Sequence, residues 1–347
     1  MAHQHPRLRV AVVGYGMAGR LIHSPLIEEA GHHVVDVVTS DVARGAAARA
    51  ELPEVRVHAD LDALLARAGA DARSRPDVVV LATPTGSHVE HALAVVAAGL
   101  PVVVDKPIAL DEAGARRVVE AAEAAGVPLT VFHNRRWDDE QRTLAGLLDA
   151  GTLGTVHRFE RRWERWRPVP KDRWRENAVG QGGGLLLDLG AHLVDSAVQL
   201  FGPVTSVHAE LRSLTTLAED DVFLALTHAG GTISHLSAGS LVGAPGPRTR
   251  VLGSDGAFLV TRFEGEEGPF DAMDPGPGMA GWHVHGAQRS PVPCAPGGHA
   301  DFYRAVGPWL TGGAPPPVDP WDAVRTAVVL DAARRSATTG LPVALPG

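Results

Sequence analysis

A glycine-rich turn between a strand-like run and a helix-like run constrains the fold of this chain more than any other feature. The strand-like run Leu8–Val13 is short and rich in β-branched residues, which is typical of a buried parallel strand. It leads into the pattern G-x-G-x-x-G, formed by Gly14, Tyr15, Gly16, Met17, Ala18 and Gly19, and the helix-like run Arg20–Ala30 follows. Glycines in this pattern allow a tight bend, close approach of a pyrophosphate to the backbone, and close packing of helix on strand. The sequence therefore predicts a phosphate-binding turn.

Strand-like and helix-like runs alternate through the first 133 residues. The further strand-like runs are Val34–Thr39, Val78–Ala82, Val102–Val104 and Leu129–Phe132. The Ala-rich runs that favour helix are Val42–Ala50, Asp60–Ala68, His88–Ala98 and Asp111–Ala125. This alternation predicts an α/β fold with a parallel sheet and right-handed crossovers, a doubly wound Rossmann domain over residues 1–133.

The pattern changes in the second predicted domain, residues 134–347. Long alternating segments predict strands, with turn signals at 229–231 and 254–256, so we expect an antiparallel sheet. These segments are Val156–Trp163, Val204–Leu214, Val222–His228 and Thr232–Gly239. The Pro- and Gly-rich stretch Gly265–Gly298 has little periodicity and is expected to form loops. A helix is predicted at Trp321–Ala337, and the sequence leaves open whether it packs back on the first domain.

Composition and charge exclude several classes of protein. The 347 residues are 45% hydrophobic and 21% charged, as in an ordinary globular protein. The net charge of -8 and the lack of an isolated basic block argue against a nucleic-acid partner. We see no signal peptide and no apolar run near the roughly 20 residues that span a bilayer. The single Cys294 cannot form an internal disulfide and is given no role, so we expect a cytoplasmic protein without a membrane partner.

The choice of dinucleotide depends on the end of the second predicted strand. An acidic residue about 20 residues beyond the glycines commonly holds the ribose hydroxyls of NAD. Ser40 and Asp41 are the candidates here. Asp41 at the ribose position would favour NAD, whereas Ser40 there would leave room for a 2′-phosphate with Arg44 nearby. We expect NADP or NAD, with a slight preference for NADP.

A lysine follows the strand-like run Val102–Val104, in the sequence Asp105-Lys106-Pro107. Ligands of open α/β sheets bind at the carboxyl ends of the strands, where a cation could polarise a substrate oxygen. An ordinary surface lysine at a turn would look the same in sequence.

An apolar helix with one polar stripe is the second candidate site. Asp188, His192, Asp195 and Gln199 are spaced by four, three and four residues, so they share one helix face. A histidine can accept a proton from a hydroxyl as hydride leaves, and a carboxylate one turn away can orient it. We rank catalysis first, a structural polar network second and a metal site third, because no recognisable ligand spacing supports zinc.

The glycine turn, Asp105-Lys106-Pro107 and Gly182–Asp195 together resemble the Gfo/Idh/MocA oxidoreductase family. The resemblance implies a Rossmann domain followed by an α/β domain with a large, mostly antiparallel open sheet, and a homodimer or homotetramer. It implies Lys106, Asp188 and His192 as catalytic residues, and Thr83, Pro84 and His88 along the cofactor. The family's commoner Glu is Asp105 here, which shortens the carboxylate's reach beside Lys106 and the cofactor. Residues 133–138 and 174–176 are most similar to its NADP-dependent scyllo-inositol 2-dehydrogenase branch.

The resemblance implies hydride transfer between a secondary alcohol of a polyol or sugar and nicotinamide. His192 would be the general acid/base, Asp188 would orient it, and Lys106 would polarise the reacting oxygen. Two alternatives stay open: redox-neutral sugar chemistry with tightly bound NAD, and a dinucleotide-binding regulator without turnover. Trp163, Trp166 and Trp174 could stack on a sugar ring or simply pack on a sheet beneath arginine side chains.

Overall fold

The computed structural model describes residues 7–171, 173–262 and 268–346, which divide into two compact units. The first unit comprises the chain up to Asn134 together with His299–Val324, and the second comprises Arg135–Gly298 and Arg325–Gly347. The segment His299–Val324 thus belongs to the first unit, whereas the sequence pattern places it in the second domain.

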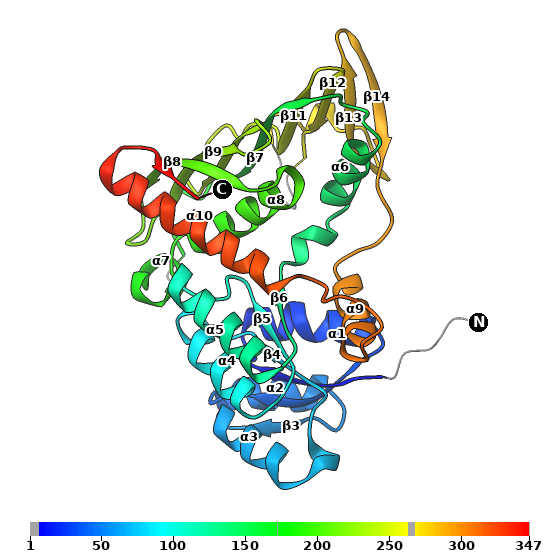
Figure 1. The fold of residues 1–347 in the computed structure, drawn as a ribbon, viewed down its shortest axis with the longest axis vertical. Coiled ribbons are helices and arrows are strands. Elements are labelled where there is room, and N and C mark those ends of the chain that lie inside the picture. The colour runs from blue at the N-terminus through cyan, green and yellow to red at the C-terminus, as the bar shows by residue number, and fades with distance from the viewer. Residues whose placement is uncertain (1–6, 172, 263–267, 347) are drawn as a thin grey trace, which may run out of the picture. The chain divides into compact units, whose positions relative to one another are not determined.

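The first unit contains a six-stranded parallel sheet in the order β3-β2-β1-β4-β5-β6. The strands are β1 (Arg9–Val13), β2 (His33–Val38), β3 (Arg56–His58), β4 (Val78–Leu81), β5 (Val102–Asp105) and β6 (Leu129–Phe132). The helices are η1 (Gly19–His23), α1 (Ser24–Glu29), α2 (Val42–Glu51), α3 (Leu61–Ala70), η2 (Ala72–Ser74), η3 (Thr85–Ser87), α4 (His88–Ala97), α5 (Glu112–Ala125) and α9 (Ala300–Leu310). This arrangement, with α4 and α5 side by side, confirms the predicted Rossmann fold (Figure 1).

Local sequence explains where these elements begin and why the last helix joins them. Asp41, Asp60 and Asp111 cap α2, α3 and α5, each accepting a hydrogen bond from the backbone N–H three residues on. Within the first unit, Phe132 of β6 contacts Phe302 of α9, with ring centroids 4.9 Å apart. Burial of these rings holds α9 on the parallel sheet.

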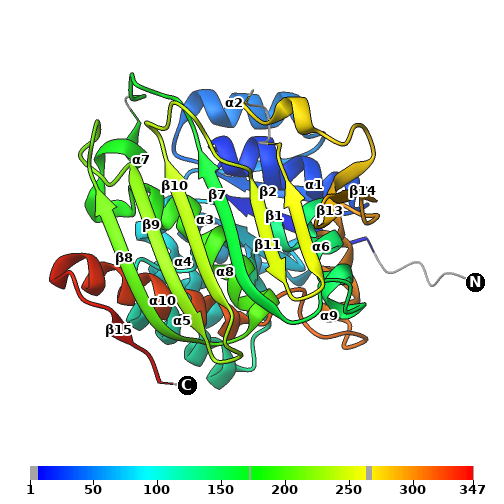
Figure 2. The same ribbon diagram turned by 90° about the horizontal axis from the view of Figure 1, so that it is seen from above.

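The second unit contains a nine-stranded sheet in the order β14-β13-β12-β11-β7-β10-β9-β8-β15. The strands are β7 (Val156–Glu164), β8 (Val204–Arg212), β9 (Asp221–His228), β10 (Ile233–Gly239), β11 (Thr249–Gly253), β12 (Gly256–Val260), β13 (Met279–His285), β14 (Gln288–Pro293) and β15 (Val343–Ala344). In the described chain, neighbouring strands run antiparallel except β7 and β10, which are parallel. The predicted, mostly antiparallel sheet is therefore confirmed, and Figure 2 shows its face.

Helices η6 (Leu186–Gly190) and α8 (Ala191–Phe201) pack against this sheet, where both contact β10. The other helices of the second unit are α6 (Asp139–Asp149), α7 (Trp174–Asn177), η5 (Val179–Gln181) and η7 (Asp271–Met273). The predicted C-terminal helix is confirmed as α10 (Pro320–Thr339), which passes from the first unit to the second after Val324. η4 (Asn134–Trp137) likewise spans the junction. In the second unit, α8 and α10 lie behind the strands (Figure 2), where Ser336 of α10 accepts a hydrogen bond from the Ala209 N–H of β8.

The expectation of loops over Gly265–Gly298 is wrong for residues 279–293. β13 and β14 form a hairpin that extends the sheet through β12, while residues 265–267 lie outside the described residues. Pro291 and Pro293 lie on β14, an edge strand, where a missing N–H costs no ladder hydrogen bond.

One described segment, Val179–Phe201, is long and apolar enough by composition to cross a membrane. Two-thirds of its most apolar window (67%) is buried within the structure, as expected for a core helix of a folded domain.

Candidate functional site

The glycine turn of the first unit has the shape that a pyrophosphate requires. Gly14 has φ +95°, and a Cβ there would lie 2.8 Å from the Ala82 carbonyl oxygen. A Cβ on Gly19 would lie 1.9 Å from the Gly14 carbonyl oxygen, so only glycine permits this helix to start so close to β1. At Gly16 a Cβ would have Nη1 of Arg44 as its nearest neighbour, 3.6 Å away, which leaves the backbone open on that side. The turn therefore fits a dinucleotide's phosphates.

The side chains within the turn differ in exposure. Tyr15 is buried, and its hydroxyl donates to Glu51 Oε2 at 3.0 Å, so at the turn only its backbone is presented. Met17 is half exposed at 51%.

After β2, the side chains of Asp41 and Arg44 make different contacts. Asp41 Oδ1 accepts a hydrogen bond from the Arg44 N–H at 3.0 Å and so caps α2. The Arg44 side chain reaches back towards Gly16, with its Nε 3.6 Å from Asp41 Oδ2. Ser40, Asp41 and Arg44 are all exposed. A cation therefore stands beside the glycine turn, and the nearby carboxylate is engaged in capping.

His88 links the loop after β4 to the loop after β5. Its ring is 1% exposed, with Nε2 2.8 Å from the Thr83 carbonyl oxygen and Nδ1 2.8 Å from the Pro107 carbonyl oxygen. Burial lowers the pKa of His88 despite the nearby carboxylate of Asp105. Both ring nitrogens face protein carbonyls, so we assign this side chain to holding the Thr83-Pro84 and Lys106-Pro107 loops in place.

Asp105 lies at the carboxyl end of β5 beside Lys106, within a buried polar cluster. Its Oδ1 accepts a hydrogen bond from the Lys106 N–H at 2.8 Å, and its Oδ2 lies 3.6 Å from His23 Nε2. His23 Nδ1 in turn lies 2.6 Å from the Tyr303 hydroxyl. Burial alone would raise the pKa of Asp105, but His23 and the charge of Lys106 outweigh it and hold the pKa at about 2.

Replacing Asp105 by Asn should change how stability depends on pH. The folded-state pKa of about 2 lies below the ordinary 3.8, so the carboxylate stabilises the protein above about pH 4. That contribution, about 2 kcal/mol, is lost as the pH falls from about 4 towards 2. Urea unfolding followed by Trp fluorescence should show that the native protein has a larger free energy of unfolding than Asp105→Asn. This difference should become smaller below pH 4. The exposed control Asp62→Asn should show no such convergence, and a gap for Asp105→Asn that is constant with pH would contradict this account.

In the second unit the predicted polar stripe separates into two parts. Asp188 and His192 are partly exposed; Asp188 Oδ1 lies 3.5 Å from Arg175 Nε. Asp195 is buried and forms a bidentate pair with Arg136, at 2.6 and 3.0 Å. Gln199 is exposed and accepts a hydrogen bond from Gln141 Nε2. The first half of the stripe is thus partly exposed, and the second half anchors α8 to the segment before β7.

His192 packs against Trp163 of β7. The two rings are stacked, with centroids 5.9 Å apart and an interplanar angle of 30°. Trp163 is only 7% exposed, and the guanidinium carbons of Arg135, Arg165 and Arg248 lie 4.7, 5.4 and 4.5 Å from its ring centroid. This side chain is therefore a packing residue under arginines and a support for His192, and not an exposed platform for a sugar.

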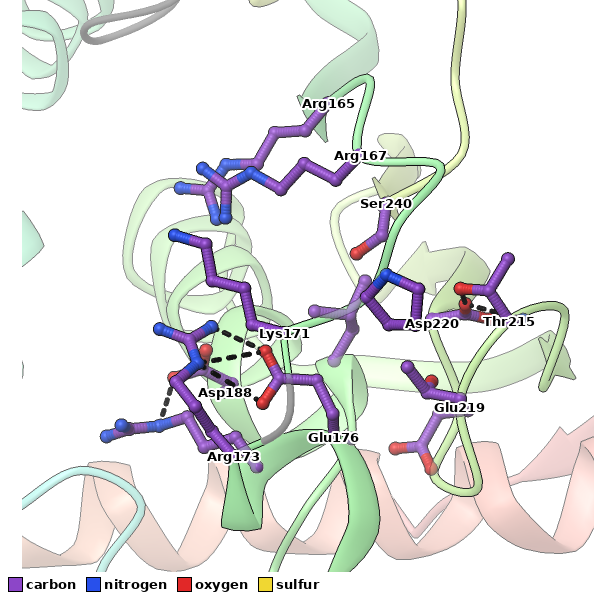
Figure 3. Close-up of a pocket in the computed structure, with 15 residues that line it drawn as sticks. Arg165, Arg167, Lys171, Arg173, Glu176, Asp188, Thr215, Glu219, Asp220 and Ser240 are labelled. Atoms are coloured by element: carbon purple, nitrogen blue, oxygen red, sulfur yellow. Dashed lines mark hydrogen bonds and ion pairs between the residues drawn. The ribbon is translucent and has the colours of Figure 1, made fainter.

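A pocket in the second unit opens beside Asp188 (Figure 3). It is a hollow of about 570 Å³, counting the solvent at its mouth. Its cationic lining residues are Arg165, Arg167, Lys171, Arg173 and Arg175, and its acidic ones are Glu176, Asp188, Glu219 and Asp220. Sequence reasoning missed this set except Arg175, Glu176 and Asp188; the run of basic residues from 165 to 175 was the signal that could have found it. Among the described residues, no group of three His, Cys, Asp or Glu side chains could hold a metal.

Comparisons with known proteins agree with both units. Residues 8–133 match the model of an oxidoreductase family with an NAD-binding Rossmann fold, GFO/IDH/MocA, and residues 141–259 match the GFO/IDH/MocA C-terminal domain.

Individual relatives cover nearly the whole chain. IolW of Bacillus subtilis, a scyllo-inositol 2-dehydrogenase (NADP⁺), is 28% identical over 95% of this chain and 93% of its own. YdgJ of Escherichia coli, an uncharacterized oxidoreductase, is 32% identical over 95% of this chain and 96% of its own. The solved structure of the WlbA dehydrogenase of Bordetella pertussis, in complex with NADH and UDP-GlcNAcA, is 25% identical. It superimposes with a TM-score of 0.79 over 98% of this chain and 99% of that one.

Proposed function

Because the chain belongs to the Gfo/Idh/MocA oxidoreductase family, we propose that it is an NAD(P)-dependent dehydrogenase acting on a secondary alcohol of a polyol or sugar. The observation that carries this proposal lies in the first unit. The glycine turn after β1, the Thr83 loop after β4 and Lys106 after β5 all lie at the carboxyl edge of one parallel sheet. This edge is where open α/β sheets bind ligands.

The roles of the residues follow from their chemistry. The dinucleotide, when bound, accepts or donates the hydride. Lys106 stabilises negative charge on the reacting oxygen, and its backbone is held by Asp105 Oδ1. His192 takes the proton of the alcohol in oxidation and returns it in reduction, and Trp163 stacks on its ring to fix its orientation. Asp188 lies one helical turn before His192, where its carboxylate stabilises the protonated imidazole.

The direct test is absorbance in the reduced-nicotinamide band. Purified protein is mixed separately with NAD and NADP, and with a panel of inositols, aldoses, sugar phosphates and sugar acids. Substrate-dependent reduction of one dinucleotide is expected. Dinucleotide binding without reduction in any well would reject the dehydrogenase proposal; product analysis would then separate redox-neutral sugar chemistry from a regulator without turnover.

We propose NADP as the preferred dinucleotide, supported by Arg44 beside the turn and by the engagement of Asp41 in capping. Arg44→Ala should raise the KM for NADP about 10- to 100-fold, the usual value of one charge-assisted hydrogen bond to a phosphate. The KM for NAD, which lacks the 2′-phosphate, should change little. Arg49→Ala, an exposed arginine farther along α2, is the matched control and should leave both KM values unchanged. Equal KM increases for NAD and NADP in Arg44→Ala would reject this role.

A further inference from the structure

We infer that His23 and Tyr303 are positioning residues for Lys106, because together they hold the Asp105 carboxylate, whose other oxygen fixes the Lys106 backbone. The inference rests on the proposed function, which makes Lys106 a catalytic residue. All four residues belong to the first unit, although Tyr303 of α9 follows His23 by 280 residues in the chain.

His23 differs from two other buried histidines of the first unit. His32 Nδ1 accepts a hydrogen bond from the Leu8 N–H at 3.3 Å and its Nε2 lies 2.9 Å from the Tyr303 carbonyl oxygen, while His88 faces two carbonyls as described above. His23 is 1% exposed, and its Nε2 has no hydrogen-bond partner among the described residues. A buried nitrogen without a hydrogen bond costs free energy, so packing alone does not explain a histidine at this position.

The Tyr303 hydroxyl determines which ring nitrogen of His23 carries the hydrogen. Burial, with the nearby Asp105 carboxylate, raises the pKa of Tyr303 well above its ordinary 10, so the hydroxyl stays protonated. Its O–H donates to His23 Nδ1 at 2.6 Å, which leaves the hydrogen of the neutral ring on Nε2. That nitrogen lies 3.6 Å from Asp105 Oδ2, farther than a direct hydrogen bond, so the contact is electrostatic.

Aromatic rings limit the access of water to this contact. Phe132 packs on the His23 ring with centroids 4.4 Å apart, and the Tyr303 ring centroid lies 5.6 Å from that of Phe132. Phe132 is 2% exposed, and the Asp105 side chain is 16% exposed. Electrostatic contacts are screened less in such surroundings than in water, so the imidazole N–H can hold the Asp105 carboxylate.

Asp105 connects this contact to the Lys106 backbone. Its Oδ1 accepts the hydrogen bond from the Lys106 N–H at 2.8 Å, and His88 Nδ1 lies 2.8 Å from the Pro107 carbonyl oxygen just beyond. The backbone is thus held on both sides of Lys106, which sets the direction in which that side chain leaves the chain. A shift of about 1 Å in a catalytic group can lower a rate by about 100-fold. His23 and Tyr303 therefore act on catalysis through Asp105.

Substitution of His23 or Tyr303 should lower kcat and leave the KM for the dinucleotide little changed. His23→Leu leaves Asp105 Oδ2 beside an apolar side chain, and kcat should fall about 10- to 100-fold, as expected when a charged group loses a polar partner. His23→Gln, whose amide N–H can donate to Asp105, should recover most of this loss. Tyr303→Phe removes only the hydroxyl and should lower kcat about 2- to 10-fold.

His32→Leu is the matched control for a purely structural effect. His32 is buried against the same residue of α9, and its substitution removes two hydrogen bonds. This variant should be less stable than the native protein in urea but should keep the native kcat. Equal stability losses in His32→Leu and His23→Leu, with native kcat in both, would show that His23 only supports the fold.

A second measurement does not depend on turnover. Amide hydrogen exchange is followed by mass spectrometry on a peptide that contains Lys106, whose N–H is held by Asp105. Exchange there should be at least about 10-fold faster in His23→Leu than in the native protein. It should be close to native in His23→Gln and in His32→Leu.

The outcomes separate this inference from the proposed function. Alcohol oxidation with unchanged kcat in folded Tyr303→Phe, or a loss in His23→Leu that His23→Gln does not recover, would overturn the positioning role and leave the dehydrogenase function standing. Tyr303→Phe decides this even where His23→Leu fails to fold. Faster exchange at Lys106 in His23→Leu, without alcohol oxidation by the native protein, would support the hold on Lys106 and reject the dehydrogenase function.

Discussion

The His192→Asn variant should turn over its alcohol substrate about 10²- to 10⁴-fold more slowly than the native protein, because it lacks the general acid/base. Asparagine keeps a polar group of similar reach but cannot take up a proton near neutral pH. His192 is partly exposed and stacked on Trp163, so the substitution removes little packing and the protein should remain folded. The loss should fall on kcat, with little change in the KM for the dinucleotide.

A matched control and a pH profile sharpen this experiment. His157→Asn replaces an exposed histidine on β7 of the same unit and should keep native activity. The native protein should lose activity as the histidine becomes protonated, and the residual activity of His192→Asn should lack that acid limb. Full turnover by folded His192→Asn would assign the proton transfer to another group.

Lys106→Met should also lower kcat by a factor of about 10² to 10³, because one charged donor to the reacting oxygen is lost.

The Asp195→Ala variant should lose about 3–5 kcal/mol in the free energy of unfolding, the usual cost of removing one partner of a buried ion pair. Asp195 is 3% exposed and binds Arg136 through both carboxylate oxygens, and the Arg136 side chain is itself only 14% exposed. Removing the carboxylate deprives a buried guanidinium of its bidentate partner. The pair also holds α8, so the position of His192, three residues earlier, should become less fixed.

Urea unfolding followed by Trp fluorescence measures this loss. The exposed pair of Glu112 and Arg116 on α5 is the control, and Glu112→Ala should cost less than about 1 kcal/mol. The double variant Asp195→Leu with Arg136→Met should recover much of the lost stability, because two apolar side chains of similar volume need no partner. A loss below about 1 kcal/mol in Asp195→Ala would show that the pair contributes no more than a surface ion pair.

The Rossmann unit could be predicted because its signals are local. Buried parallel strands appear in sequence as short apolar runs, and the glycines are required by backbone geometry within a few residues of each other. The short strand β3 (Arg56–His58) was missed because its residues are mostly polar. It is held in place by Asp36 of β2, which is buried and binds both Arg56 and His58 at 2.8 Å. Such a contact depends on tertiary structure and leaves no periodic pattern.

The candidate site could be predicted only in part, for the same reason. Helical spacing placed Asp188 and His192 one turn apart, but it also grouped Asp195 with them. Only the three-dimensional structure shows that Asp195 is buried and pairs with Arg136. The choice between Ser40 and Asp41 could not be made from sequence. It depends on the capping role of Asp41 and on the direction taken by the Arg44 side chain, neither of which spacing reveals.

The single parallel pair in the nine-stranded sheet has a consequence for how the second unit forms during synthesis. β7 leaves the ribosome before both of its neighbours, β10 and β11, whereas β8–β9–β10 and β11–β12 can pair with their neighbours as local hairpins. Long loops must close to bring β7 between these two hairpin sets. This closure costs chain entropy before the hydrogen bonds between β7 and its neighbours can stabilise the sheet. Assembly around β7 should therefore limit the folding rate, and until then the unpaired edges of both hairpin sets are where nascent chains would associate with one another.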